Sequence, residues 1–401
     1  MRKVFDEAVI AGIALNNRVL RSATHEGMSD KTGKPTEQLV SRYVALAKGG
    51  VGAIITGYIG IQKNGKAPLS NMLMLDTDDN IEPLGDLVKA VHTYRTPIIA
   101  QLAHCGRQTR SKSTGYKPVA PSAIRDKVYN EETPHELNER EIIEIIHNFV
   151  LAIERSKKAG FDGVQLHCAH GYLLSSFLSP HMNKRTDKWG GTTENRFRIV
   201  KEIFIEARKK IGEYPILAKI NAYEKSKDGI KLPEAIKIAK YLESVGCDAI
   251  EVSAGTVEDG FVTVRGNVPV DIMLRDNFRL QKISTCFHPI VKLIIKKVFA
   301  GPKPYELYNL DSAVEIKKNV KTPVIVVGGI TKLEDIQNII EKEMCDFVSM
   351  SRALILEPDL VNKFKEGRKT QAKCINCNYC LIGGEERSLK CYYGRISEVW
   401  Q

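Results

Sequence analysis

The stretch Pro323-Val324-Ile325-Val326-Val327-Gly328-Gly329-Ile330-Thr331 indicates how this 401-residue chain folds. Its apolar residues do not alternate with polar ones, which is typical of a strand buried on both faces of a parallel sheet. A Gly-Gly turn and a segment of helical periodicity follow, and Thr331-x-x-Glu334 predicts a capping box at the start of that helix. The stretch therefore predicts one unit of a strand followed by a helix.

Seven further apolar runs of this kind occur along the chain, and most of them are separated by helical segments. The predicted strands are Val19–Thr24, Gly52–Thr56, Pro97–Leu102, Gly163–His167, Ile216–Ile220, Ala249–Ser253, Pro323–Gly328 and Phe347–Ser351. The predicted helices lie near residues 36–48, 81–93, 139–159, 194–211, 232–245, 311–319, 333–343 and 358–367. Eight such units predict an α/β protein with a closed (β/α)8 TIM barrel. An open doubly wound sheet is disfavoured because no Gly-x-Gly-x-x-Gly turn follows the first strand.

We expect residues 1–367 to form the barrel and residues 368–401 to form a Cys-rich C-terminal extension. Two connections are longer than a barrel needs, namely 103–138 after the third strand and 254–310 after the sixth. The second contains the basic amphipathic segment Ile290–Phe299, which suits contact with a membrane, contact with a partner helix, or a lid packed on the barrel mouth. We expect a lid-like insertion.

The composition excludes several classes of protein. With 43% hydrophobic and 27% charged residues, the chain is neither disordered nor a coiled coil. No apolar run approaches the ~20 residues of a membrane span, and acidic residues stand where a signal peptide would be apolar, so we expect a cytoplasmic protein. The net charge of +11 is dispersed. We therefore expect no nucleic acid and no membrane as partners, and a homo-oligomer remains open.

Reacting groups of a TIM barrel lie at the C-terminal ends of its strands, so the residues there indicate the site. Gly328-Gly329 before a helix N-terminus and Ser351-Arg352 after the eighth strand match a barrel phosphate site. Gln101 and Lys219, on the third and fifth strands, are suited to hold a planar ligand with several donors and acceptors. Flavin mononucleotide (FMN) carries both such a ring and a phosphate.

Several separated motifs of the chain resemble the old yellow enzyme family of flavin-dependent ene-reductases. The motifs are Leu15-Asn16-Asn17-Arg18-Val19, Gln101-Leu102-Ala103-His104-x-Gly106-Arg107, the run from His167-x-Ala169-His170-Gly171-Tyr172 to Ser179-Pro180, and Asn183-Lys184-Arg185-Thr186-Asp187-x-Trp189-Gly190-Gly191 with Glu194-Asn195-Arg196. The resemblance covers roughly residues 1–365. It implies a TIM barrel with FMN at its mouth, NAD(P)H as the reductant and an electron-poor alkene as the substrate.

The resemblance also implies a role for individual residues. The implied FMN contacts are Ser22, Ala23 and Thr24 along one side of the ring, Gly57 from the second strand, Gln101 at the pyrimidine edge, Lys219 at N1 and O2, and Gly328, Gly329, Ser351 and Arg352 at the phosphate. Many members carry Arg at the position of Lys219. His167 and His170 match the pair that binds the substrate carbonyl oxygen, and Tyr172 matches the usual proton donor. No role is assigned to His25 or Glu26, and Arg107 suits either a ligand contact or a loop anchor.

Four of the nine cysteines gather near the C-terminus as Cys374-x-x-Cys377-x-x-Cys380 and Cys391, a spacing typical of metal ligands. The loop resembles that of the branch that includes 2,4-dienoyl-CoA reductase and trimethylamine dehydrogenase, where a four-iron (4Fe-4S) cluster feeds FMN. Zinc, or free thiols that only pin the tail, are alternatives. The chain ends ten residues after Cys391, without the second, FAD-binding half of that branch. Either NAD(P)H reduces FMN directly, or a redox partner protein supplies electrons through the cluster.

The leading hypothesis is an FMN-dependent oxidoreductase that reduces activated C=C bonds of α,β-unsaturated carbonyl compounds with NAD(P)H. In it, hydride leaves flavin N5, Tyr172 donates the proton, and His167 and His170 hold the carbonyl oxygen. Two alternatives remain: an amine dehydrogenase or demethylase that uses the same flavin, and an electron-transfer subunit that works through the Cys loop.

Overall fold

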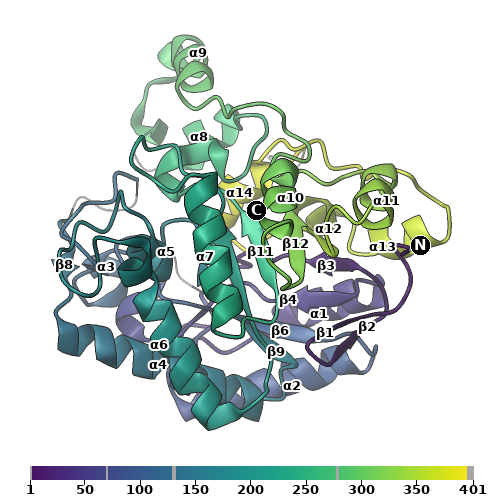
Figure 1. Ribbon diagram of the computed structural model, residues 1–401. Coiled ribbons are helices and arrows are strands. Elements are labelled where there is room, and N and C mark those ends of the chain that lie inside the picture. Colours follow the sequence, from purple (N-terminus) through teal and green to yellow (C-terminus); the bar gives the residue numbers. More distant parts are fainter. Residues whose placement is uncertain (1, 69–70, 129–131, 277–279, 395–401) are drawn as a thin grey trace.

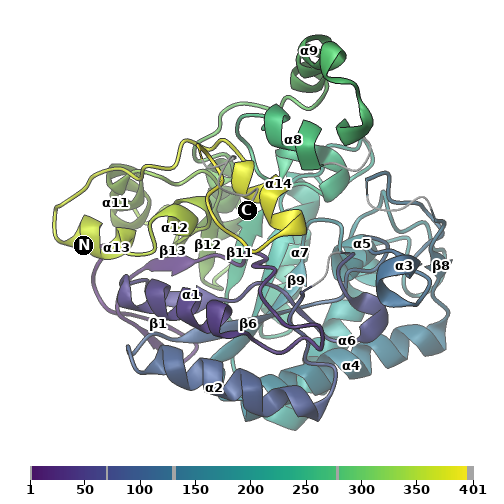
Figure 2. The ribbon, with the colours of Figure 1, turned by 180° about the vertical axis from the view of Figure 1, so that it is seen from behind.

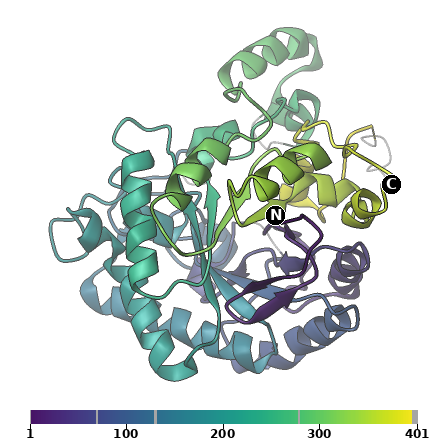
Figure 3. The ribbon, with the colours of Figure 1, turned by 45° about the vertical axis from the view of Figure 1, so that its right-hand side comes forward.

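The computed structural model describes residues 2–68, 71–128, 132–276 and 280–394, and its centre is a barrel of eight parallel strands (Figure 1, Figure 3). The barrel strands are β3 (Val19–Arg21), β4 (Ala53–Ile55), β6 (Ile98–Ala103), β9 (Gly163–Cys168), β10 (Ile216–Asn221), β11 (Ile250–Ser253), β12 (Val324–Val327) and β13 (Phe347–Met350). β4 pairs with both β3 and β6, which closes the cylinder. The predicted TIM barrel is confirmed.

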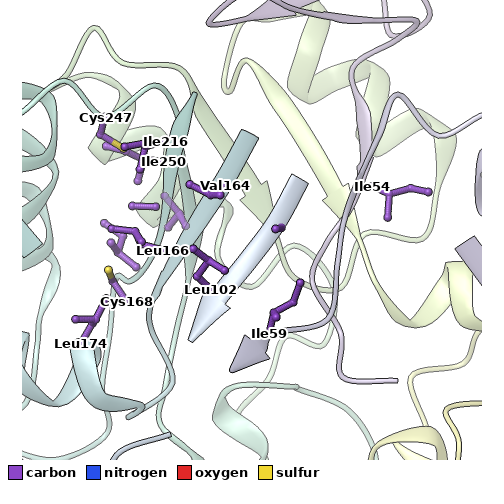
Figure 4. Packing of buried hydrophobic residues seen from close by; sticks show 14 of the residues in the cluster. Ile54, Ile59, Leu102, Val164, Leu166, Cys168, Leu174, Ile216, Cys247 and Ile250 are labelled. Carbon is purple, nitrogen blue, oxygen red and sulfur yellow. The ribbon is translucent and has the colours of Figure 1, made fainter. Parts of the chain in front are cut away.

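Helices surround the strands and shield their outer faces (Figure 1). The helices of the barrel and its loops are α1 (Glu37–Lys48), α2 (Ile81–His92), α3 (Ser111–Thr114), α4 (Glu139–Lys158), α5 (Leu173–Leu178), α6 (Thr193–Ile211), α7 (Leu232–Ser244), α10 (Leu310–Lys317), α11 (Leu333–Glu341), α12 (Arg352–Leu356) and α13 (Leu360–Lys365). Their apolar faces pack on the outward side chains of the strands, among them Ile54, Leu102, Val164, Leu166 and Ile216 (Figure 4). The outer core is therefore the layer between strands and helices.

The predicted capping box at the start of α11 is wrong. The N-cap residue is Lys332, and its side chain makes no capping hydrogen bond. The Thr331 hydroxyl instead faces Glu306 at 3.5 Å, and the Thr331 carbonyl accepts from the Ala372 amide. Contacts with two distant segments therefore replace the local cap.

An N-terminal hairpin that the sequence did not reveal closes the lower end of the barrel. β1 (Ala8–Ile10) and β2 (Ile13–Leu15) pair antiparallel. Their buried side chains cluster with inward residues from the first half of the barrel strands, which are Leu20, Ala53, Ile55, Ile99, Leu217, Ala249, Ile325 and Phe347. We call this cluster the barrel floor. Because the floor is filled, the cylinder has depth for a ligand only at the C-terminal ends of the strands.

The insertion after β11 has two parts with different positions. Its first residues lie at the strand ends, where Thr256 pairs with His170. Farther along, α8 (Val270–Asp276) carries α9 (His288–Val298), which projects from the molecule (Figure 1, Figure 2). The C-terminal helix α14 (Tyr379–Glu386) packs against α8. The lid-like role of residues 254–310 and the division at residue 367 stay predictions.

Besides the hairpin, the described residues form three further short strands outside the barrel proper: β5 (Ile59–Gly60) extends the sheet beside β6, and β7 (Val119–Ala120) pairs with β8 (His135–Glu136). Within the described ranges, none of the helices has the length and apolar character needed to cross a lipid bilayer.

Candidate active site at the barrel mouth

A layer of polar side chains lies inside the barrel directly above the apolar floor. Its members, at most 3% exposed, are Ser22, Gln101, Gln165, Lys219, Glu251 and Ser349. They are reached from the floor by moving two residues along a strand, for example from Ile99 to Gln101 and from Leu217 to Lys219. Since strand residues two apart face the same side, all six point into the barrel. We call this set the polar layer.

Hydrogen bonds join the whole polar layer through Glu251. Its Oε1 accepts from the hydroxyls of Ser22 at 2.7 Å and Ser349 at 2.6 Å. Its Oε2 accepts from Gln165 Nε2 at 2.9 Å and lies 3.4 Å from Lys219 Nζ. Lys219 Nζ also donates to Ser22 Oγ at 3.0 Å, and Gln101 Nε2 donates to Gln165 Oε1 at 2.7 Å. The predicted residues Ser22, Gln101 and Lys219 are thus brought together.

The proposed substrate residues stand above this layer on β9 and the turn that follows it. The ring centroids of His167 and His170 are 5.1 Å apart and nearly perpendicular, and those of His167 and Tyr172 are 4.7 Å apart. His170 has a positive φ of 65°, so the turn reverses sharply there, and Tyr172 is the N-cap residue of α5. The backbone therefore brings all three side chains to one place.

Burial keeps these histidines neutral. It lowers the pKa of His170 to about 3, with a further contribution from the Lys219 charge. It also lowers the pKa of His167 well below its usual value, and there His170 and Lys219 add to the effect. His170 Nε2 lies 2.8 Å from Ser253 Oγ, whereas the buried His167 Nδ1 has no hydrogen-bond partner in the described part of the chain. A neutral imidazole still offers one N–H donor to a ligand.

His25 and Glu26, to which the sequence assigned no role, have clear structural contacts. His25 stacks on Tyr58 with the ring centroids 4.9 Å apart, and Tyr58 in turn lies 5.4 Å from Tyr172. Glu26 is buried, pairs with Arg21 and accepts from the Tyr43 hydroxyl. Gly57 is needed beside it, because a Cβ at that position would collide with the Glu26 carboxylate. Glu26 therefore helps to fix the backbone at Gly57.

The predicted phosphate residues meet at the ends of β12 and β13. Gly328 and Gly329 have φ values of 136° and 69°, which favour glycine, and Tyr305 and Tyr308 of the insertion lie against them. Ser351 Oγ lies 2.7 Å from Thr24 Oγ1. Arg352 Nη1 donates to Arg265 O at 2.8 Å and to Asn378 Oδ1 at 2.7 Å. The returning end of the insertion therefore borders this place.

The arrangement fits FMN in its donor set. The polar layer provides an ammonium and an amide at the base of the mouth, and the unpartnered His167 Nδ1 is a buried polar atom that a bound molecule would satisfy. Ala23 and Thr24 are partly exposed at the rim, above the buried Ser22. The residues at the ends of β12 and β13 supply an arginine and backbone amides.

Arg107 anchors loops. Its guanidinium is buried, pairs with Glu258 at 2.5 Å and donates to Arg125 O at 2.7 Å. Glu258 also accepts from the Lys127 amide at 2.7 Å. Of the two roles considered for Arg107, the structure shows the anchor, which ties the loop after β6 to the start of the insertion.

The four cysteines of the C-terminal loop lie near one another. Burial raises the pKa of the Cys374, Cys377 and Cys380 thiols, for Cys380 to about 12, and each of these pKa values is raised further by neighbouring thiols of the loop. The charge of Arg352 acts in the opposite direction on Cys374 and Cys380. Among the described side chains, no three His, Cys, Asp or Glu groups are placed as ligands of one metal ion. The thiols therefore match a metal site in type and neighbourhood, and the metal stays a prediction.

Sequence analysis missed half of the polar layer, namely Gln165, Glu251 and Ser349. A signal for them exists, because each is a polar residue flanked on both sides by apolar residues within a strand, as in Ile250-Glu251-Val252. These residues lie at strand positions that face the inside of the barrel, as Gln101 and Lys219 do, and this shared direction would have revealed the layer.

Comparison with known proteins identifies the family. The model of the NADH:flavin oxidoreductase / NADH oxidase family matches residues 3–272 and 280–371. The chain belongs to this family. It is 36% identical over 384 residues to an NADH oxidase of Thermoanaerobacter brockii, covering 95% of this chain and 54% of that protein. It is 32% identical over 358 residues to an NADPH dehydrogenase of Halalkalibacterium halodurans, covering 89% and 92%.

Solved structures of flavin enzymes share the fold of this family member. A 2-naphthoyl-CoA reductase has a TM-score of 0.81 at 23% identity, covering 97% of this chain and 56% of that one. An old yellow enzyme homologue from Zymomonas mobilis has a TM-score of 0.72 at 24% identity, covering 94% and 96%. The chain therefore spans about half the length of some relatives and nearly all of others. The resemblance to the old yellow enzyme family is confirmed.

Proposed function

We propose that this chain reduces activated C=C bonds of α,β-unsaturated carbonyl compounds with NAD(P)H, through FMN held at the barrel mouth. Membership of the NADH:flavin oxidoreductase / NADH oxidase family supports the reductant and the cofactor. The observation that carries the proposal is the convergence of His167, His170 and Tyr172 directly above the polar layer. Such a site combines polar groups for a flavin ring, donors for a carbonyl oxygen and a phenol.

Each side chain has a distinct task in this reaction. The bound FMN would supply hydride transfer from NAD(P)H to the β-carbon of the alkene. Gln101 would bind the pyrimidine edge of the ring and Lys219 its N1 and O2, and Ser22, Ala23, Thr24 and Gly57 would border the ring. Gly328, Gly329, Ser351 and Arg352 would hold the phosphate. The neutral imidazoles of His167 and His170 donate hydrogen bonds to the carbonyl oxygen, where negative charge grows as hydride arrives.

Tyr172 completes the balance of the reaction. Its hydroxyl gives a proton to the α-carbon, so that one hydride from NAD(P)H and one proton saturate the double bond and leave NAD(P)⁺. The phenol then regains its proton from water.

A spectrum of the purified protein tests the proposal. We expect a flavin absorbance band that disappears on anaerobic addition of NADH or NADPH and returns when an α,β-unsaturated ketone is added. A folded protein that cannot be reconstituted with FMN would overturn the proposal. A flavin that is reduced only by amines would favour the amine dehydrogenase alternative.

We further propose that Cys374, Cys377, Cys380 and Cys391 bind a metal centre, an iron–sulfur cluster rather than zinc. The support is chemical, because four neighbouring thiols on one loop are a complete ligand set for such a cluster. The loop also touches the flavin side of the molecule, since Asn378 accepts a hydrogen bond from Arg352. A cluster there would give a redox partner protein a route for electrons.

A further inference from the structure

Glu251 is a buried carboxylate for which the proposed reaction has no task. It lies in the middle of β11, points into the barrel and has no exposed surface. Burial alone would raise its pKa, but the Lys219 charge and the hydrogen bonds from Ser349, Ser22 and Gln165 together lower it. Glu251 is therefore an ionised carboxylate at neutral pH.

An ionised carboxylate can only accept hydrogen bonds, and this fixes the direction of the neighbouring amide chain. Gln165 must turn its Nε2 toward Glu251, so its Oε1 faces Gln101. Gln101 must then turn its own Nε2 toward Gln165. The oxygen end of the Gln101 amide is consequently directed away from Gln165, so that one of its two orientations is selected before any ligand arrives.

The same carboxylate orders the cationic side of the polar layer. The Ser22 hydroxyl has one proton, which it gives to Glu251, so its oxygen accepts from Lys219 Nζ. Glu251 Oε2 is also 3.4 Å from that ammonium. Lys219 is thereby held in place, and its positive charge is partly cancelled by a negative charge directly beside it.

We propose that Glu251 is a positioning residue that sets the polarity of Gln101 and lowers the effective charge of Lys219 at the flavin ring. This inference rests on the proposed function. A positive charge at the pyrimidine edge stabilises negative charge on the reduced ring, so a carboxylate that offsets the charge lowers the reduction potential of the flavin. The chain thus tunes its cofactor through a residue that does not contact it.

Glu251→Gln in the FMN-loaded protein tests this inference, because the change removes the charge and keeps the shape. We expect the flavin midpoint potential to rise and the affinity for sulfite, an anion that adds to the flavin ring, to increase by about tenfold or more. Asp162→Asn is the matched control, since Asp162 accepts from the Ile98 amide at the opposite end of the barrel. It should leave both quantities unchanged.

Gln165→Met separates the two roles of Glu251. It breaks the amide chain and keeps the Lys219–Glu251 pair, so it should weaken FMN binding and leave the potential near the wild-type value. If Glu251→Gln does not fold, Gln165→Met and Glu251→Asp take its place. Glu251→Asp should shift the flavin potential in the same direction as Glu251→Gln. Unchanged potential and sulfite affinity in FMN-loaded Glu251 variants would overturn the inference. Absence of FMN binding by the wild-type protein would instead overturn the proposed function.

A second, independent observation concerns the outer face of α9. Ile295 and Val291 pack inward with α8, whereas Ile290, Leu293 and Val298 are 61%, 71% and 66% exposed. Figure 2 shows α9 at the tip of the molecule, away from the barrel. The helix therefore presents an apolar arc to its surroundings.

The segment around α9 is also strongly basic. Residues 277–305 contain six Lys and Arg residues and no Asp or Glu, which is more than half of the net charge of +11. Lys296 and Lys297 are exposed in the last turn of α9, and Lys292 pairs with Asp271 at 2.7 Å. Apolar side chains next to lysines on one projecting helix match the requirements of an anionic lipid surface, into which the former insert while the latter meet the headgroups.

We infer, in place of the sequence-based expectation that no membrane is a partner, that α9 docks the protein onto the surface of an anionic bilayer. Co-sedimentation of the full chain with vesicles of equal parts phosphatidylglycerol and phosphatidylcholine tests this. We expect binding that salt weakens, and little binding to phosphatidylcholine alone. Lys296→Glu with Lys297→Glu should abolish binding. Lys209→Glu with Lys210→Glu on α6 changes the net charge equally and should retain it.

The apolar arc has its own matched pair of variants. Leu293→Ser should weaken vesicle binding, whereas Ile143→Ser at an exposed position of α4 should not. Absence of binding, or equal losses in the α6 and α9 charge variants, would overturn the inference. So would a dimer in solution that Leu293→Ser dissociates, because a second copy would then cover the arc.

Discussion

Aromatic rings and buried apolar side chains lie around Tyr172. It lies 4.7 Å from His167 and 5.4 Å from Tyr58 between ring centroids, and it packs on the buried cluster of Met72, Met74 and Cys105. Replacing its hydroxyl with hydrogen should leave this packing intact. Tyr172→Phe therefore removes the hydroxyl and keeps the ring in its place.

We predict that Tyr172→Phe slows the alkene half-reaction by about 10²–10⁴-fold and changes reduction of FMN by NAD(P)H by less than about twofold. Anaerobic stopped-flow absorbance of the two half-reactions measures this difference. Equal loss in both would remove Tyr172 from the role of proton donor.

Four buried histidines predict sensitivity to acid. Burial lowers the pKa of His25 to about 4 and those of His104 and His170 to about 3, and it also lowers the pKa of His167 well below its usual value. In the unfolded chain each imidazole binds a proton as the pH falls below about 6.5, whereas in the folded chain it stays neutral until a lower pH. The free energy of unfolding should therefore fall as the pH drops from about 6.5 toward 3.

Urea unfolding between pH 7 and pH 4 measures this loss of stability. His104→Asn should reduce the slope, because it removes one of the four groups.

The KM for the alkene should show no inflection near pH 6.5, since His167 and His170 stay neutral there. An inflection at that pH would show that one of them is protonated in the working enzyme.

At the level of single elements, the sequence predicted the barrel strands, which repeat, and missed the hairpin of β1 and β2, which occurs once. The eight barrel strands lie where their apolar runs placed them, because burial on both faces leaves a strong and uniform signal. The hairpin of β1 and β2 has strands of three residues each, in which two buried residues flank an exposed one. Such short patterns carry too little information to predict a floor for the barrel.

The site shows the same limit. Gln101, Lys219 and the His167–Tyr172 run could be predicted because they stand at strand ends or within family motifs. Glu251 could not, since its importance comes from four partners, on β9, β10, β13 and the residue that follows β3, which only the closed barrel brings together. The position of α9 was equally hidden, because an amphipathic pattern does not reveal which surface its apolar side will meet.

We predict that the hairpin contributes to stability and not to cofactor binding. Ile10 is buried in the barrel floor, and Ile10→Ala should lower the free energy of unfolding by about 2–5 kcal/mol. Val9, its exposed neighbour, is the control, and Val9→Ala should change stability by less than about 0.5 kcal/mol. Denaturant unfolding together with FMN titration checks both expectations, and a large loss of FMN affinity in Ile10→Ala would contradict them.

At the scale of the whole molecule, the C-terminal loop connects the barrel with the insertion. Asn378 accepts from Arg352 and donates to the carbonyls of Val264 and Asn267. We predict that anaerobically purified protein contains iron and acid-labile sulfide in equal amounts, and that Cys377→Ser loses both. Cys286→Ser, at an exposed cysteine of the insertion, should keep them. Zinc in place of iron, or no metal at all, would contradict this prediction.

The filled floor of the barrel has a kinetic consequence. Because the hairpin closes the lower end of the barrel, a molecule that binds at the polar layer must enter and leave at the C-terminal ends of the strands. If the proposed reaction takes place there, a nicotinamide and an alkene that need the same face of the ring cannot bind together and must bind one after the other. The architecture thus favours a double-displacement kinetic mechanism, in which the oxidised nicotinamide dissociates before the electron acceptor binds.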